Sequence, residues 1–125
     1  MDLKILSAKN YSTKMKATIQ RSGKLGFNSA AIEKIHISVG TYVKFAEDAE
    51  SNLYLIFLSE VNEDAFKVCK AGAYYYVNSR GIFDALNYNF QNKSVVFDMC
   101  ETNDDYGKVI YKLIERVVDE QKKQE

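Results

Sequence analysis

The stretch "KATIQRSGKLGFNSAAIEKI", residues 16–35, carries the pattern on which the fold prediction depends. Its first residues alternate, with Ala17 and Ile19 on one face and polar side chains on the other, which is typical of a half-buried strand. A turn is expected at Gly23, because glycine adopts a positive φ without steric cost. Residues 25–27 then resume the inward face, so the stretch predicts a β-hairpin.

The residues after this hairpin predict a short helix and two more strands. Asn28 or Ser29 suits the N-cap position, where a side-chain oxygen accepts a hydrogen bond from a free backbone N–H group. The apolar spacing over residues 31–35 is helical. Residues 41–45 alternate again and residues 53–58 form a nearly continuous apolar run, so both segments are expected to be strands.

The same order of elements returns later in the chain. Residues 65–99 contain a strand, a turn at Gly72, the strand-forming run "AYYYVN", a cap at Asn78 or Ser79, a short helix and a further strand. This agreement predicts an internal repeat, with a first unit at residues 16–58 and a second unit at residues 65–99.

The last part of the chain has a different pattern. Thr102 and Asp105 have the spacing of a capping box, which marks a helix N-terminus. The apolar residues that follow recur at helical spacing: Tyr106, Val109, Ile110, Leu113, Ile114 and Val117. We therefore expect a C-terminal amphipathic helix at about residues 103–122.

These elements together predict an α+β fold over residues 1–125. We expect a β-rich single domain made of two related strand-turn-strand-helix-strand units, followed by the C-terminal amphipathic helix. The longest apolar run, residues 53–58, is far too short to span a bilayer, which takes roughly 20 residues, so no membrane partner is expected. Cys69 and Cys100 are widely spaced, which favours reduced thiols and a cytoplasmic location.

The charges are balanced overall but unevenly distributed. The chain carries 17 basic and 17 acidic side chains, which argues against a basic footprint over the whole molecule. Residues 1–24 nevertheless contain a single acid, Asp2, and several cations. These cations are Lys4, Lys9, Lys14, Lys16, Arg21 and Lys24. The asymmetry permits a local surface that binds anions.

No pattern of residues assigns a reaction. His36 is the single histidine, and the sequence gives it no Ser or Asp partner with which it would form a catalytic couple. The acidic groups of residues 60–64 and 98–105 lack the ligand spacing of a calcium loop. The sequence therefore predicts a protein that is not an enzyme and holds no metal or other cofactor.

Four cations on and around the first hairpin form the principal candidate site. Lys14 and Lys16 share the face opposite Ile19, and Arg21 and Lys24 flank the predicted turn. Directed at a phosphate backbone, these charges would give an affinity that falls with salt. The alternative is a solvated hairpin edge, whose lysines deter pairing with other strands.

A second candidate surface contains aromatic residues. In a strand, Tyr74 and Tyr76 share a face, with Lys70 and Arg80 nearby in the sequence. Exposed tyrosines stack on unpaired bases and contribute about 1–3 kcal/mol per base. The alternative is that one face of this strand packs in the core and the other carries ordinary amphipathic tyrosines.

The stretch "QRSGKLGFNSAAIEKIHISVGTYVKFAEDAESNLYLIFL", residues 20–58, resembles the swapped-hairpin DNA-binding domains of the AbrB/MazE/MraZ type. The segments that match the family's order of elements are Gly23-Lys24, residues 25–28, Ile37-Ser-Val-Gly40 and residues 41–45. With residues 66–99 as a second copy, the resemblance implies an intramolecular pseudo-dimer that binds DNA and regulates transcription. The run Tyr74–Tyr76 and the expected C-terminal helix also look similar to single-stranded-nucleic-acid-binding transcriptional coactivator and Pur-type proteins.

The sequence thus favours a non-enzymatic nucleic-acid-binding protein with a regulatory role. Its expected ligand is single- or double-stranded DNA. The competing interpretation is a protein-interaction or structural module, in which the tyrosine-rich strand and the C-terminal helix meet a partner protein or a second copy in a homodimer.

Overall fold

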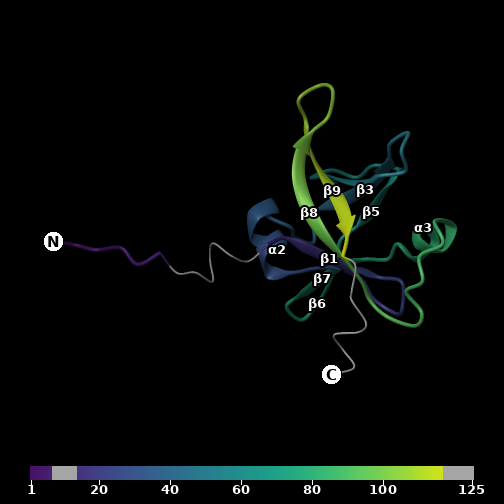
Figure 1. Ribbon diagram of the computed structural model, residues 1–125, viewed down its shortest axis with the longest axis horizontal. Coiled ribbons are helices and arrows are strands. Elements are labelled where there is room, and N and C mark those ends of the chain that lie inside the picture. Colours follow the sequence, from purple (N-terminus) through teal and green to yellow (C-terminus); the bar gives the residue numbers. More distant parts are fainter. Residues whose placement is uncertain (7–13, 117–125) are drawn as a thin grey trace.

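The structure is a computed structural model that describes residues 1–6 and 14–116. It shows a mainly-β single domain, in which nine antiparallel strands form one sheet that curls into a nearly closed barrel (Figure 1). The strands are β1 (Lys16–Ile19), β2 (Leu25–Phe27), β3 (Tyr42–Glu47), β4 (Leu53–Leu58), β5 (Ala65–Lys67), β6 (Cys69–Ala71), β7 (Tyr74–Val77), β8 (Val95–Asn103) and β9 (Val109–Glu115). Two short helices, α2 (Ser29–Ile35) and α3 (Arg80–Ala85), appear on opposite sides of the barrel in Figure 1.

The first hairpin and the helix after it have the positions predicted from the sequence. β1 and β2 pair antiparallel, with Ala17 opposite Phe27. Gly23 has a φ of +90° in the connecting turn, and its N–H donates to the carbonyl oxygen of Gln20 at 2.8 Å. An L-residue with a Cβ atom would be strained at this φ, so the turn depends on glycine.

The strand order shows how the sheet closes. From one end to the other it reads β5, β3, β4, β9, β8, β1, β2, β7 and β6. The terminal strands β5 and β6 are consecutive in the chain and are separated by Val68, whose N–H donates to the carbonyl oxygen of Thr41 at 3.0 Å. The two ends of the sheet therefore meet at one continuous segment of chain.

Pairing is exchanged between the two halves of the chain. β1 from the first half pairs with β8 from the second half, and β5 from the second half pairs with β3 from the first. β2 pairs with β7, and β4 pairs with β9. In this pairing, β8 and β9 of the second half have the place that β3 and β4 occupy in the first half.

The core fills the barrel from alternate positions of its strands. Ala17 and Ile19 on β1 are fully buried, and Ala17 lies directly between Phe27 on β2 and Phe97 on β8. Edge-to-face ring pairs continue this packing: Phe27–Phe57, Phe57–Tyr111, Phe45–Phe83, Phe83–Tyr88 and Tyr88–Phe97. Such pairs contribute about 0.5–1.5 kcal/mol each beyond the burial of apolar area.

The predicted α+β fold with a C-terminal amphipathic helix is wrong. Residues 109–115 form β9, which pairs with β8 from Phe97–Glu115 to Asn103–Val109 and on its other edge with β4. The predicted capping box belongs to the end of β8 and the turn after it. The remainder of the predicted helix, residues 117–122, lies outside the described residues.

Turn chemistry and strand periodicity explain this correction. The Asp104 carboxylate accepts hydrogen bonds from the N–H groups of Tyr106 and Lys108, at 2.9 and 2.8 Å, and Gly107 has a φ of +80°. These residues form a hairpin turn rather than a helix N-terminus. Beyond the turn, Tyr111 and Leu113 point into the core at a spacing of two, and the residues that alternate with them occupy the outer face.

The cap predicted for the second helix has the expected position but not the expected hydrogen bond. Ser79 precedes α3 at the N-cap position, but its side chain makes no capping hydrogen bond. Its hydroxyl is buried without a partner within residues 1–6 and 14–116. As for membranes, none of the helices in the described segments combines the length and apolar character that a bilayer crossing requires.

The alternation along β9 predicts unequal effects for two adjacent apolar residues. Leu113→Ala should reduce the free energy of unfolding by about 2–5 kcal/mol, because Leu113 is 6% exposed and its truncation leaves a core cavity. Ile114→Ala should cost less than about 1 kcal/mol, because Ile114 is 45% exposed on the outer face. Urea denaturation of both variants measures the difference, and similar losses would contradict a strand here.

The turn between β3 and β4 predicts a pH-dependent term in stability. Hydrogen bonds from the Asn52 side chain and backbone, and from the Tyr54 hydroxyl and the Glu50 N–H, lower the pKa of Asp48 from 3.8 to about 2. As the pH falls, the Asp48 carboxylate is therefore protonated at a higher pH in the unfolded chain than in the folded chain. This stabilisation should be complete above pH 4 and lost as the pH falls towards 2.

Unfolding of wild type and Asp48→Asn between pH 2 and 6 checks this expectation. The variant should be less stable than wild type at pH 6, and the difference should vanish near pH 2. Glu50→Gln changes a neighbouring acid of the same turn and is the matched control, because the pKa of Asp48 does not depend on the Glu50 carboxylate. A difference between wild type and Asp48→Asn that persists at pH 2 would contradict the assignment.

Candidate nucleic-acid interface

The candidate site lies on the outer face of β1 and β2. Ala17 and Ile19 point into the barrel, so the alternation directs Lys16 outwards, and Lys24 is outward because Leu25 is buried. The N–H of Asn28 donates to the carbonyl oxygen of Lys16, and the N–H of Gln20 donates to that of Lys24, so the two lysines lie at opposite ends of the hairpin. We use "hairpin basic surface" for Lys14, Lys16, Arg21 and Lys24.

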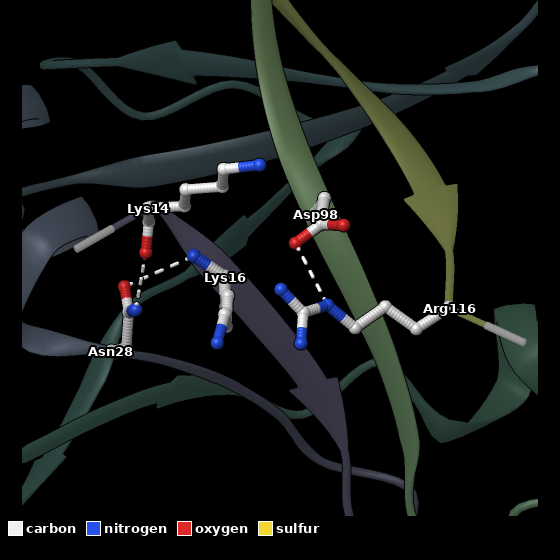
Figure 2. Close-up of polar contacts among 5 residues, drawn as sticks. All are labelled: Lys14, Lys16, Asn28, Asp98 and Arg116. Carbon is white, nitrogen blue, oxygen red and sulfur yellow. Dashed lines mark hydrogen bonds and ion pairs between the residues drawn. The ribbon is translucent and has the colours of Figure 1, made fainter. Parts of the chain in front are cut away.

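Asn28 fixes the start of this surface, as Figure 2 shows. Its side-chain oxygen accepts hydrogen bonds from the N–H groups of Lys16 and Ala31, both at 3.0 Å, and its amide nitrogen donates to the carbonyl oxygen of Lys14 at 2.7 Å. One side chain thus caps α2 and holds the backbone that carries two lysines. The sequence predicted the cap, but not the two bonds to β1 and the residue before it.

The acid that lies opposite Lys16 in the sheet forms an ion pair with another residue. Lys16 lies directly opposite Asp98 in the β1–β8 ladder. Arg116 extends from the end of β9 to Asp98, with Nε 3.0 Å from the carboxylate oxygen (Figure 2). None of the four side chains of the hairpin basic surface forms an ion pair within residues 1–6 and 14–116.

Lys14 lies beside a shallow hollow at the same end of the hairpin. The hollow has a volume of about 370 Å³ and brings Lys14 together with Lys34 on α2 and with Asp98 on β8. Lys34 extends the positive charge beyond the four residues predicted from the sequence, and Arg116 balances the charge of Asp98 beside them. Neither residue was assigned to this surface from the sequence. Arg116 was placed in the predicted C-terminal helix, and no sequence motif includes Lys34.

The other end of the hairpin is the turn that carries Arg21 and Lys24. Arg21 is exposed and Lys24 is half-buried. Arg80, at the start of α3, packs against Gly23, where an added Cβ would lie 2.5 Å from the Cβ and Cγ atoms of Arg80. Arg80 also pairs with Asp84 at 3.5 Å and lies 5.7 Å from the Phe90 ring centre, so its role in this structure is to cover the turn.

The two tyrosines form a compact stack. The rings of Tyr74 and Tyr76 have centroids 5.5 Å apart and planes 21° apart. The hydroxyl end of Tyr74 lies against Gly26 in the space that a Cβ atom would occupy. The Tyr74 hydroxyl is buried without a partner in the described part of the chain, and burial raises the pKa of this phenol.

Two lysines lie over neighbouring tyrosines. The Lys24 ammonium is 4.6 Å from the ring centre of Tyr76, and the Lys70 ammonium is 5.5 Å from that of Tyr75. Tyr75 packs against the core and Lys70 is exposed at the edge strand β6. The structure thus joins Tyr74 and Tyr76 to the hairpin basic surface through Lys24, whereas Lys70 contacts Tyr75 and Arg80 contacts Asp84 and Phe90.

Other candidate groups remain apart from this surface. His36 is exposed and has a φ of +64° at the C-cap of α2. Residues 1–6 and 14–116 contain no group of three or more His, Cys, Asp or Glu residues that could hold a metal ion. Comparison with known proteins gave no matching family model, no significant match among curated proteins and no significant match among solved structures.

The three hydrogen bonds of Asn28 predict a measurable structural role. Asn28→Ala should lower the free energy of unfolding by about 1–2 kcal/mol through removal of the cap. It should also speed the exchange of the Lys16 and Ala31 amide hydrogens, whose acceptor is removed. Ser29→Ala is the matched control, because alanine is tolerated in the first turn of a helix. Equal exchange rates in both variants would contradict the bonds described.

Proposed function

We propose that this protein binds nucleic acid without catalysis and acts as a regulatory binding protein. The hairpin basic surface contacts the phosphate backbone, and Lys34 adds positive charge at one end of it. Binding of this kind depends on the number of phosphates neutralised, because each neutralised phosphate releases condensed counterions.

One observation carries this proposal. Lys14, Lys16 and Lys24 lie on or beside adjacent strands that share an outer face, and none has an ion-pair partner in the described residues. Asp98 would neutralise Lys16, but Arg116 occupies it at 3.0 Å. A solvated edge is the other explanation for lysines on a hairpin, yet β1 is paired on both sides and has no free edge to protect.

The strand exchange supports the resemblance to swapped-hairpin DNA-binding domains. β1 pairs with β8 and β5 pairs with β3, so each half of the chain completes the sheet of the other. An intramolecular pseudo-dimer of that type would need this exchange. The second hairpin has Ala73 where the first has Lys24, so we assign phosphate binding to the first hairpin alone.

The competing interpretation was a protein-interaction module that binds a partner through the tyrosine-rich strand and a C-terminal helix, and the structure has a strand where that helix was expected to begin. Residues 109–115 form β9 within the sheet and present no amphipathic helix to a partner. Tyr75, in the tyrosine-rich strand, packs against the core of this protein. Both observations favour nucleic-acid binding over partner binding through those two elements.

Fluorescence anisotropy with a labelled 20-base-pair duplex tests the proposal. The variant Lys16→Ala, Arg21→Ala and Lys24→Ala should bind at least ten-fold more weakly at 50 mM salt. Its salt dependence should be shallower by about one power of salt concentration for each phosphate that the variant no longer neutralises. With four phosphates neutralised, wild-type affinity should fall on the order of 100-fold between 50 and 200 mM salt.

A charge-matched control separates the surface from net charge. Lys44→Ala, Lys67→Ala and Lys108→Ala remove the same number of cations from β3, β5 and the β8–β9 turn. This control should keep the wild-type salt slope. Equal weakening in both triple variants, or no binding by wild type at 50 mM salt, would refute the proposal.

A further inference from the structure

We infer that Tyr74 and Tyr76 act as a support that holds Lys24 towards phosphate, so that the surface binds the backbone of duplex DNA without stacking on its bases. This inference rests on the proposed function and names the target of the same surface. It also reverses the role expected for these tyrosines from the sequence, where they were candidates for stacking on unpaired bases.

The register of β2 and β7 places the participants in order. Leu25 lies opposite Val77 and Gly26 lies opposite Tyr76, so along the strands the backbone of Lys24 lies beyond Tyr76 on the side away from Tyr74. The Lys24 ammonium is 4.6 Å from the centre of the Tyr76 ring. The Tyr74 ring stacks on the Tyr76 ring, with the centroids 5.5 Å apart.

The stack reduces the aromatic surface that is open to a base. The Tyr76 ring is in contact with both Lys24 and Tyr74, while the hydroxyl end of Tyr74 fills the space above Gly26. Stacking of a base requires an accessible ring face. An unpaired base that stacked on Tyr76 would therefore compete with Lys24 or with Tyr74, so single strands gain less here from the stacking interaction that normally favours them.

The same arrangement restricts a flexible cation. A lysine side chain has a large rotamer entropy, which is lost when it binds a phosphate. A cation–π contact restricts Lys24 before the ligand arrives, and its ammonium keeps the remaining donors for a phosphate oxygen. Duplex DNA offers the denser row of phosphates, with one charge per roughly 1.7 Å of helix axis.

Gly26 is needed at its position because it has no Cβ atom and so leaves room for the Tyr74 side chain. A Cβ at residue 26 would lie 1.8 Å from the Tyr74 hydroxyl oxygen and 2.4 Å from its Cζ atom. Any larger residue must therefore displace Tyr74 and disturb the stack. Gly26→Ala changes no charge, so it perturbs the support for Lys24 while leaving the lysine in place.

Anisotropy measurements on a 20-base-pair duplex and on one of its single strands test the inference. Tyr76→Leu should weaken duplex binding about two- to five-fold, the range expected from removal of an exposed cation–π interaction. Lys24→Ala should weaken it at least as much, because it also removes a phosphate contact. The double variant should bind duplex DNA no more weakly than Lys24→Ala alone, because the Tyr76 ring has no ammonium to hold once Lys24 is removed. Tyr76→Phe keeps the ring and should restore the affinity, and Tyr42→Leu, on β3, serves as the tyrosine control.

Intrinsic fluorescence adds an independent readout, because the chain contains nine tyrosines and no tryptophan. The single strand should bind more weakly than the duplex and leave the tyrosine emission unchanged. Tighter single-strand binding that quenches this emission, and that Tyr76→Leu weakens about five-fold or more, would overturn the inference in favour of base stacking.

Proton NMR of the free protein separates this inference from the proposed function. The side-chain protons of Lys24 should be shifted upfield by the Tyr76 ring current, and Tyr76→Leu should abolish that shift. A wild-type spectrum without the shift would overturn the support role even if duplex DNA binds. A normal shift with no binding to either nucleic acid would refute the proposed function, and with it the assigned target.

Discussion

The double pairing of β1 is the constraint on which the rest of the structure depends. This four-residue strand is hydrogen-bonded to β2 on one edge and to β8 on the other, and it joins segments that are far apart in the chain. Ala17 is small enough to lie between Phe27 and Phe97, which face it from the two neighbouring strands. A larger residue at this fully buried position would separate the halves of the barrel.

The charged surface follows from the same pairing. Because the inward positions of β1 belong to the core, its lysines have only the outer face available. β8 brings Asp98 beside Lys16, and β9 brings Arg116 to that carboxylate, so the pairing decides which cation is neutralised. On the other edge, β7 carries Tyr76 to within a cation–π contact of Lys24.

The sequence predicted those strands, turns and caps that depend on residues close together in the chain. The alternation around Ala17 and the turn at Gly23 were predicted correctly from the sequence, and Asn28 was one of the two predicted caps, since each depends on neighbouring residues. The segment 109–115 was not, because its apolar residues satisfy both a helical spacing and a strand spacing. β-branched residues and the Asp104–Gly107 turn were the signals that should have favoured a strand.

The sequence by itself determined that the first hairpin carries a cluster of cations and that Tyr74 and Tyr76 share a face, because alternation along a strand is a local property. Tertiary structure decided which residues meet on that face. The Lys24–Tyr76 contact and the space above Gly26 each join β2 to β7, and the Asp98–Arg116 pair lies beside Lys16 only because β8 pairs with β1. Pairing between distant strands depends on the fit of the whole core, which no single segment encodes.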